Sequence, residues 1–139
     1  MHTCTLEEIA GRFGRFERST RRQRLTEALE RYVNEVRALG VADALIIDGS
    51  YVTTKPEPND IDMILVLRNE LQLGKESTPA EYNVGSTRIV RRRFGFDVLT
   101  VVQDSARYVE YMELFSRIRR ADPDLRTGQA NKGVLRIQL

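Results

Sequence analysis

The sequence predicts an α+β fold, because short apolar runs typical of strands alternate with longer segments of helical periodicity. Residues 44–47 and 63–67 are rich in residues that favour strands and are too short for helices. Residues 94–102 form a third run of this kind. Apolar residues recur at helical spacing over residues 20–39 and 105–120, which predicts two amphipathic helices. Helices are therefore expected to flank a sheet.

The first two predicted helices carry their own start and stop signals. Residues 5–14 fit a short helix in which Thr5 is the N-cap and Glu8, three residues later, completes a capping box. Thr20 has a glutamine at the same spacing and opens the long helix, which Gly40 is expected to end. The short helix is expected to pack against the core or against another chain.

The second half of the chain is less regular. Residues 79–90 fit either a helical turn or a strand. Asp104 or Ser105 is expected to cap the last helix. Residues 134–139 alternate between apolar and polar, which predicts a half-exposed strand at the edge of the sheet.

Length and charge limit the possible functions. A chain of 139 residues can build one hydrophobic core, and we expect residues 1–18 to form an N-terminal arm with a helix and residues 19–139 a single domain. The chain has 22 Lys and Arg against 20 Asp and Glu, a formal net charge of only +2. This small excess disfavours a general nucleic-acid binder.

Cysteine and histidine are nearly absent. Cys4 is the single cysteine, which excludes an internal disulfide and a multi-cysteine zinc site. His2 is the single histidine and lies near the terminus, which nearly excludes histidine-dependent catalytic triads. The sequence has no run approaching the roughly 18 apolar residues of a membrane span, and it lacks a signal-peptide pattern. We therefore expect a cytoplasmic protein without a membrane partner.

Three aspartates lie within the strand-like runs. Asp60 and Asp62 flank Ile61, and residues two apart on a strand project from the same face, with a rise of about 3.3 Å per residue. Asp97 lies in the run 94–102, and if the two strands pair, three carboxylates converge. Carboxylates that close together repel one another, so one takes a proton or a cation lies between them. All-oxygen ligands favour a hard ion such as Mg2+, with Mn2+ as an alternative.

A turn and a loop precede these aspartates. Gly49 lets the backbone approach a ligand closely, and exposed amides together with the Ser50 hydroxyl can hold the phosphate oxygens of a nucleotide. Thr53 and Lys55 lie in the loop that follows, and we expect both to contact a nucleoside triphosphate. A solvated loop lysine is the alternative interpretation of Lys55.

These motifs together resemble the DNA polymerase β-type nucleotidyltransferase superfamily. The similarity rests on residues 48–50, nine residues before Asp-Ile-Asp-Met at 60–63, and on Phe-Asp-Val at 96–98. With the closing segment 132–137, the chain is also similar to small bacterial proteins of that fold. The resemblance implies a palm-like fold with a mixed sheet of about four to five strands flanked by helices.

The same resemblance implies a chemistry. A nucleoside monophosphate would move from a nucleoside triphosphate, ATP among them, onto a hydroxyl of a protein or an RNA. Asp60, Asp62 and Asp97 would hold two Mg2+ ions roughly 4 Å apart. Asp97 acting as a general base is the alternative to its role as a metal ligand.

A second class of function keeps the fold without turnover. Small members of the superfamily are found beside HEPN-type toxins, where they neutralise the toxin by adenylylating it or by masking it. This chain has Thr54-Lys55-Pro56 in place of the arginine and glycine pattern of those antitoxins. The chain thus departs from that subgroup at this loop. On the resemblance in fold alone, a catalytically inert module that acts through a partner protein, or as a homo-oligomer, is the alternative to an enzyme.

A basic cluster allows a third interpretation. Arg88, Arg91, Arg92 and Arg93 could bind RNA, nucleotide phosphates or an acidic partner, or could simply be exposed. Near-zero net charge and the lack of an aromatic platform on a strand argue against an RNA-binding domain. An ion pair between Asp97 and either Arg91 or Arg93 is the structural alternative to a metal site.

Overall fold

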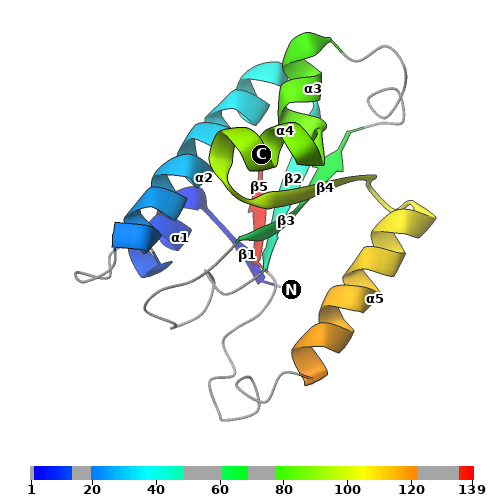
Figure 1. The fold of residues 1–139 in the computed structure, drawn as a ribbon. Coiled ribbons are helices and arrows are strands. Elements are labelled where there is room, and N and C mark those ends of the chain that lie inside the picture. Colours follow the sequence, from blue (N-terminus) through cyan, green and yellow to red (C-terminus); the bar gives the residue numbers. More distant parts are fainter. Residues whose placement is uncertain (1, 14–19, 49–60, 69–77, 122–134) are drawn as a thin grey trace.

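The computed structural model describes residues 2–13, 20–48, 61–68, 78–121 and 135–139 (Figure 1). These residues form five strands and five helices. The strands are β1 (His2–Cys4), β2 (Ala42–Asp48), β3 (Asp62–Leu67), β4 (Asp97–Val102) and β5 (Leu135–Gln138). The helices are α1 (Leu6–Phe13), α2 (Thr20–Leu39), α3 (Pro79–Gly85), α4 (Thr87–Phe94) and α5 (Ala106–Ala121).

The strands form one mixed sheet in the order β1-β5-β2-β3-β4. β2 is antiparallel to both of its neighbours, β3 and β5. β1 and β4 each pair in parallel with the strand beside them. The α+β class and the mixed sheet are therefore confirmed.

Two layers of helices cover the sheet. Figure 1 shows α5 on the opposite side of the sheet from α1 and α2. Side chains of α1, α2, α3 and α4 share a hydrophobic cluster with one face of the sheet. On the other face, a smaller buried cluster from β2, β3 and β4 packs against three residues of α5, namely Tyr108, Tyr111 and Met112.

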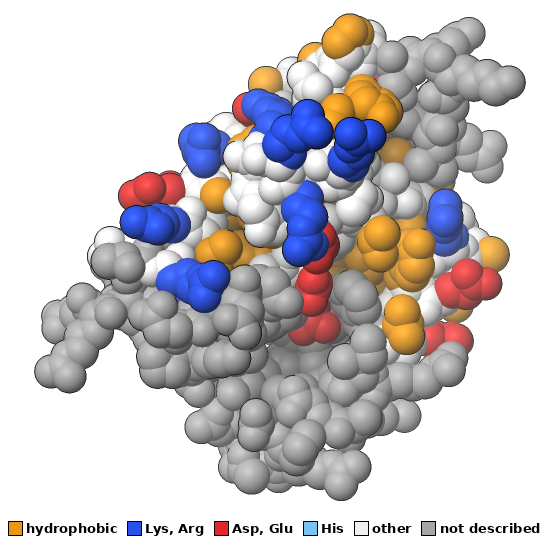
Figure 2. Space-filling view, viewed as in Figure 1, with side chains coloured by type: hydrophobic (Ala, Val, Ile, Leu, Met, Phe, Trp, Pro, Cys, Tyr) orange, Lys and Arg blue, Asp and Glu red, His pale blue; other side chains and the backbone are white. Residues whose placement is uncertain are grey.

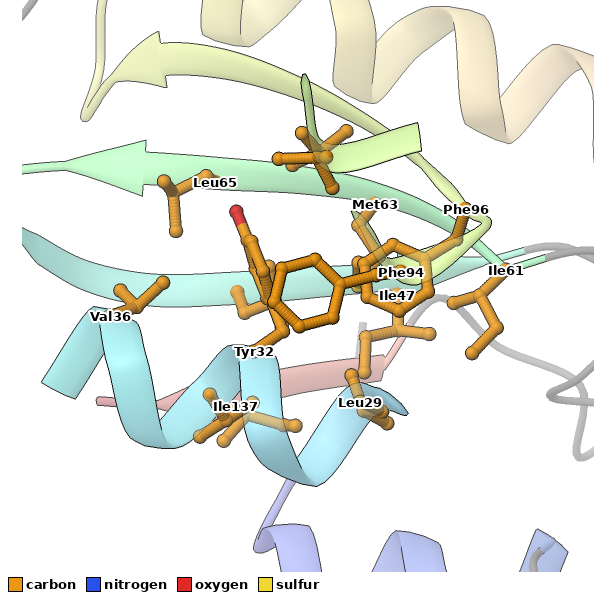
Figure 3. Close-up of a cluster of buried hydrophobic side chains, with 14 of the residues drawn as sticks. Leu29, Tyr32, Val36, Ile47, Ile61, Met63, Leu65, Phe94, Phe96 and Ile137 are labelled. Atoms are coloured by element: carbon orange, nitrogen blue, oxygen red, sulfur yellow. The ribbon is translucent and has the colours of Figure 1, made fainter. Parts of the chain in front are cut away.

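Tyr32 of α2 lies at the centre of the larger cluster (Figure 3). Its ring meets Phe94 and Phe96 edge to face, with centroids 5.4 and 5.5 Å apart. Its hydroxyl donates a hydrogen bond of 2.7 Å to the carbonyl oxygen of Val84 in α3. Burial, with a smaller contribution from Glu35, raises the pKa of the Tyr32 hydroxyl. These contacts hold α3 and the end of α4 against α2.

Local signals in the sequence place most helix ends correctly. The Glu8 amide donates to Thr5 Oγ1 at 3.1 Å and the Thr5 amide to Glu8 Oε2 at 2.7 Å, which confirms the capping box. Gly40, with φ of 66°, ends α2 as predicted. The Ser105 hydroxyl accepts a hydrogen bond from the Tyr108 amide at 3.2 Å, so Ser105 rather than Asp104 caps α5.

Three expectations about the second half need correction or completion. The C-terminal strand β5 is not at the edge of the sheet, because β1 pairs with its outer side. Residues 79–90, left open between helix and strand, are helical in α3 and the start of α4. Thr78 caps α3 in a capping box with Glu81. The predicted strand at 94–102 begins only at 97, because Phe94 still belongs to α4.

The N-terminal segment contributes to the same sheet and core. β1 pairs with β5, and three apolar residues of α1, Leu6, Ile9 and Phe13, belong to the larger hydrophobic cluster. No described helix has both the length and the apolar character needed to span a membrane.

Candidate functional site

Strands β3 and β4 bring two of the predicted site residues together. In the parallel register Asp62 lies opposite Asp97, which places their Cα atoms about 4.8 Å apart. Met63 and Val98, the next residues along each strand, belong to the cluster beneath α2. Because successive residues on a strand face opposite sides, Asp62 and Asp97 both lie on the α5 side of the sheet. The expectation that these two strands are neighbours is confirmed.

Burial of the flanking residues fixes the backbone at both positions. Ile61 and Met63 on either side of Asp62 are at most 1% exposed, and so are Phe96 and Val98 on either side of Asp97. Moving either aspartate would expose these apolar side chains to water, which is costly. The carboxylates are therefore attached to a rigid part of the sheet.

Asp48 forms a row of three acids with Asp62 and Asp97 across neighbouring strands, and it was not among the site residues predicted from the sequence. It ends β2 and lies opposite Asp62 in the antiparallel register. Ala44 and Ile46 of β2 belong to the buried cluster on the α5 side, so alternation places Asp48 on that side as well. The sequence signal that could have found Asp48 is the alternation of buried and exposed faces along β2, in which every second residue lies on the same side. Among the described residues, no three acidic, histidine or cysteine side chains gather closely enough to hold a metal ion.

Arg91 of α4 lies beside this row. Gly95, with φ of 83°, ends α4 and turns the chain into β4. The turn brings Arg91 Nη1 to 2.5 Å from Asp97 Oδ1. The hydrogen bond and charge of Asp97, with a smaller contribution from Asp62, raise the pKa of Arg91. The guanidinium thus contacts the Asp97 carboxylate and also feels the charge of Asp62, and the ion pair considered as an alternative for Asp97 is present.

This ion pair is open to solvent. The Arg91 side chain is 68% exposed and that of Asp97 44%. Figure 2 shows acidic side chains meeting a basic side chain in the middle of this face, with further basic side chains over α4. An exposed pair of this kind contributes little to stability and weakens further in salt. The pair can therefore be opened at low cost.

The other arginines of the cluster have different surroundings. Arg93 donates through both terminal nitrogens to the Glu35 carboxylate, at 2.9 and 2.8 Å. Its guanidinium also lies 4.8 Å from the centre of the Phe94 ring. Arg88 and Arg92 are exposed and form no ion pair or hydrogen bond from their side chains within the described part of the chain. The basic cluster thus divides into two paired arginines and two solvent-facing ones.

The remaining predicted site residues lie outside the described residues, so their roles stay predictions. These are Asp60 as a metal ligand and Gly49, Ser50, Thr53 and Lys55 as nucleotide contacts.

A separate hollow lies between α1 and the sheet, and none of the aspartates lines it. Cys4, Arg12 and Leu135 are among its lining residues. Burial, together with the charge of Glu8, raises the pKa of the Cys4 thiol. A raised pKa lowers the thiolate fraction at neutral pH, which disfavours Cys4 as a nucleophile.

Comparison with known proteins identifies the family. A model of the family described as "Family of unknown function (DUF6932)" matches residues 1–138, and the chain belongs to this family. Neither the curated proteins nor the solved structures contain a match to the chain.

Proposed function

We propose that the protein is a metal-dependent nucleotidyltransferase of the DNA polymerase β type, which moves a nucleoside monophosphate from a nucleoside triphosphate onto a protein or RNA hydroxyl. The observation that carries the proposal is the register of Asp62 against Asp97 on adjacent parallel strands. This register supports the proposal because Asp62 and Asp97 belong to the two motifs, at 60–63 and 96–98, that the resemblance to the superfamily implies in one site. The mixed sheet with helices on both faces is compatible with a palm-like fold.

The described donors fit a hard divalent ion in their chemistry. Asp62 and Asp97 offer only carboxylate oxygens and lie on a partly exposed face, so water and a phosphate can reach them. Asp60, implied by the resemblance, would complete the ligand set, and Asp48 adds negative charge to the row. When bound, Mg2+ would lower the pKa of the acceptor hydroxyl and neutralise charge on the phosphates.

The side chains themselves have a positioning role. Asp62 and Asp97 are attached to backbone that buried neighbours hold in place, so the two carboxylates start from fixed positions on the sheet before substrate binds. Asp97 is partly exposed and its oxygen already accepts a hydrogen bond from a cation, Arg91, so the same oxygen can accept a metal ion in that position.

A second function is favoured by one observation. Arg91 forms an ion pair with Asp97, and among the described residues no three side chains are grouped so that they could hold a metal ion. A nucleotidyltransferase-fold module that neutralises its own acidic row would bind a partner protein without turnover, as in the antitoxin-like alternative.

The test measures metal binding and transfer in matched aspartate variants. Mn2+ binding is followed by electron paramagnetic resonance, and transfer by incubating the protein with labelled nucleoside triphosphates, Mg2+ or Mn2+, and cell lysate. We expect Asp62→Asn to abolish Mn2+ binding and labelling while leaving the fold intact. Asp43→Asn is the control, because Asp43 lies on the neighbouring strand β2, away from the other aspartates, and pairs with an arginine, Arg68, at 3.0 Å. Five residues at about 3.3 Å each separate it from Asp48 by about 17 Å.

The outcomes separate the two functions. Labelling that requires Asp62 and not Asp43 supports the enzyme. Metal-dependent nucleotide binding without labelling supports the inert module. Absence of Mn2+ binding in the unaltered protein contradicts both the metal site and the proposed reaction, and it leaves partner binding as the remaining function.

A further inference from the structure

We propose that Arg91 has two alternating partners: it neutralises Asp97 when the row carries no metal, and it binds a phosphate of the nucleotide when a divalent ion takes the Asp97 oxygen. The inference rests on the proposed function and adds a positioning residue that the sequence motifs do not include.

The two cations compete for the same oxygen. Arg91 Nη1 lies 2.5 Å from Asp97 Oδ1, whereas Mg2+ requires a carboxylate oxygen at about 2.0–2.1 Å. A guanidinium held that close to the oxygen would repel the incoming ion. The charge of Asp62 also raises the pKa of Arg91, so the guanidinium charge acts on Asp62 as well as on Asp97. Metal binding at Asp97 is therefore expected to displace the guanidinium.

The displacement requires only a side-chain rotation. Val90 and Phe94, on either side of Arg91 in α4, are buried, and the Tyr32 and Phe96 rings pack against Phe94. The helix backbone is thus anchored, while the Arg91 side chain is largely exposed. A new side-chain rotamer costs little compared with a movement of the helix.

The displaced guanidinium is left next to the site without its anion. A planar fork of N–H donors matches the oxygens of a phosphate, so the triphosphate held at the row is a suitable new partner. Arg93 is unsuited to this role, because Glu35 already occupies both of its terminal nitrogens. Arg92 points elsewhere, because adjacent residues on a helix are separated by about 100°.

The experiment compares Arg91→Ala with Arg92→Ala, which removes the same charge one residue along the same helix. Mn2+ is first titrated into each protein without nucleotide, and a non-hydrolysable nucleoside triphosphate analogue is then titrated at saturating Mn2+. For Arg91→Ala we expect Mn2+ to bind roughly two- to five-fold more tightly and the analogue about ten-fold more weakly. For Arg92→Ala both affinities are expected to stay within about two-fold of the unaltered protein. Opposite shifts in one variant are the signature that a purely structural role would not produce.

Arg91→Lys provides a conservative variant. It keeps the charge and loses the fork, so Mn2+ affinity is expected to stay close to that of the unaltered protein and analogue binding to be only partly restored. Thermal unfolding of all three variants checks that each is folded, as expected for substitutions of exposed side chains.

The failure of this inference and of the proposed function can be told apart. If the unaltered protein binds Mn2+ in an Asp62-dependent manner but Arg91→Ala matches Arg92→Ala, the role of Arg91 is refuted and the proposed function stands. Weaker binding of both Mn2+ and analogue in Arg91→Ala also refutes it, since Arg91 would then support Asp97 instead of competing with metal. If the unaltered protein binds no Mn2+, both ideas are wrong.

Discussion

Replacing Tyr32 with phenylalanine tests the contact that ties α3 and α4 to the core. The Tyr32 hydroxyl donates to the Val84 carbonyl, which lies in the last turn of α3 where carbonyls lack helical partners. Tyr32 is fully buried and Val84 only 1% exposed, so water cannot replace the lost donor. An unsatisfied buried carbonyl costs about 1–3 kcal/mol, whereas the phenyl ring keeps its edge contacts with Phe94 and Phe96.

The expected result is a loss of unfolding free energy of about 1–3 kcal/mol in urea denaturation, with an unchanged m-value. For a chain of this size, this corresponds to a melting temperature lower by roughly 3 °C per kcal/mol. Tyr82→Phe is the matched control, because Tyr82 of α3 is 57% exposed and its hydroxyl can bond to water. Equal stability of Tyr32→Phe and Tyr82→Phe would refute the reasoning that this hydrogen bond holds α3 in place.

Two further predictions concern pH and the N-terminal helix. Because the folded state raises the pKa of Tyr32 above its ordinary value of 10.0, its contribution to stability is complete below pH 10 and decreases as the pH rises above it, where the unfolded chain ionises. Urea denaturation at pH 8 and pH 11 should therefore show a smaller alkaline loss for Tyr32→Phe, and equal losses would contradict the buried hydroxyl. Arg22 is fully buried and donates to the Phe13 carbonyl at the end of α1 at 2.9 Å. Arg22→Ala is expected to lower the free energy of unfolding by about 2–4 kcal/mol. Arg21→Ala, which removes an exposed side chain, is expected to lower it by under about 0.5 kcal/mol. Similar losses for the two variants in chemical denaturation would argue that the hydrogen bond from Arg22 to Phe13 does not stabilise the protein.

The strands and helices could be predicted because their signals lie within a few residues of each element. Thr5 and Glu8 cap α1 from three residues apart, and Gly40 ends α2 through its own backbone conformation. Residues 79–90 resisted assignment because a short helix that breaks at Ser86 and restarts shows no sustained period. The edge position expected for residues 134–139 was wrong, because the pairing of β5 with β1 depends on a segment at the other end of the chain.

The candidate site was partly predictable for the same reason. The strand-like runs and the motifs within them were sufficient to select Asp62 and Asp97. Alternation along β2 could have placed Asp48 on the same face, but its position opposite Asp62 follows only from the register of β2 against β3.

By itself, the sequence determined most of the helices and strands, though not β1 or the helices within residues 79–90, and it located the acidic residues beside the strands, since both depend on local patterns of side chains. Only the tertiary structure decided which carboxylates share a row and which arginine meets Asp97. Arg91 pairs with Asp97, while Arg93 turns to Glu35, 58 positions away in the sequence. Such choices depend on strand register and helix packing, which bring distant residues together and leave no local signal.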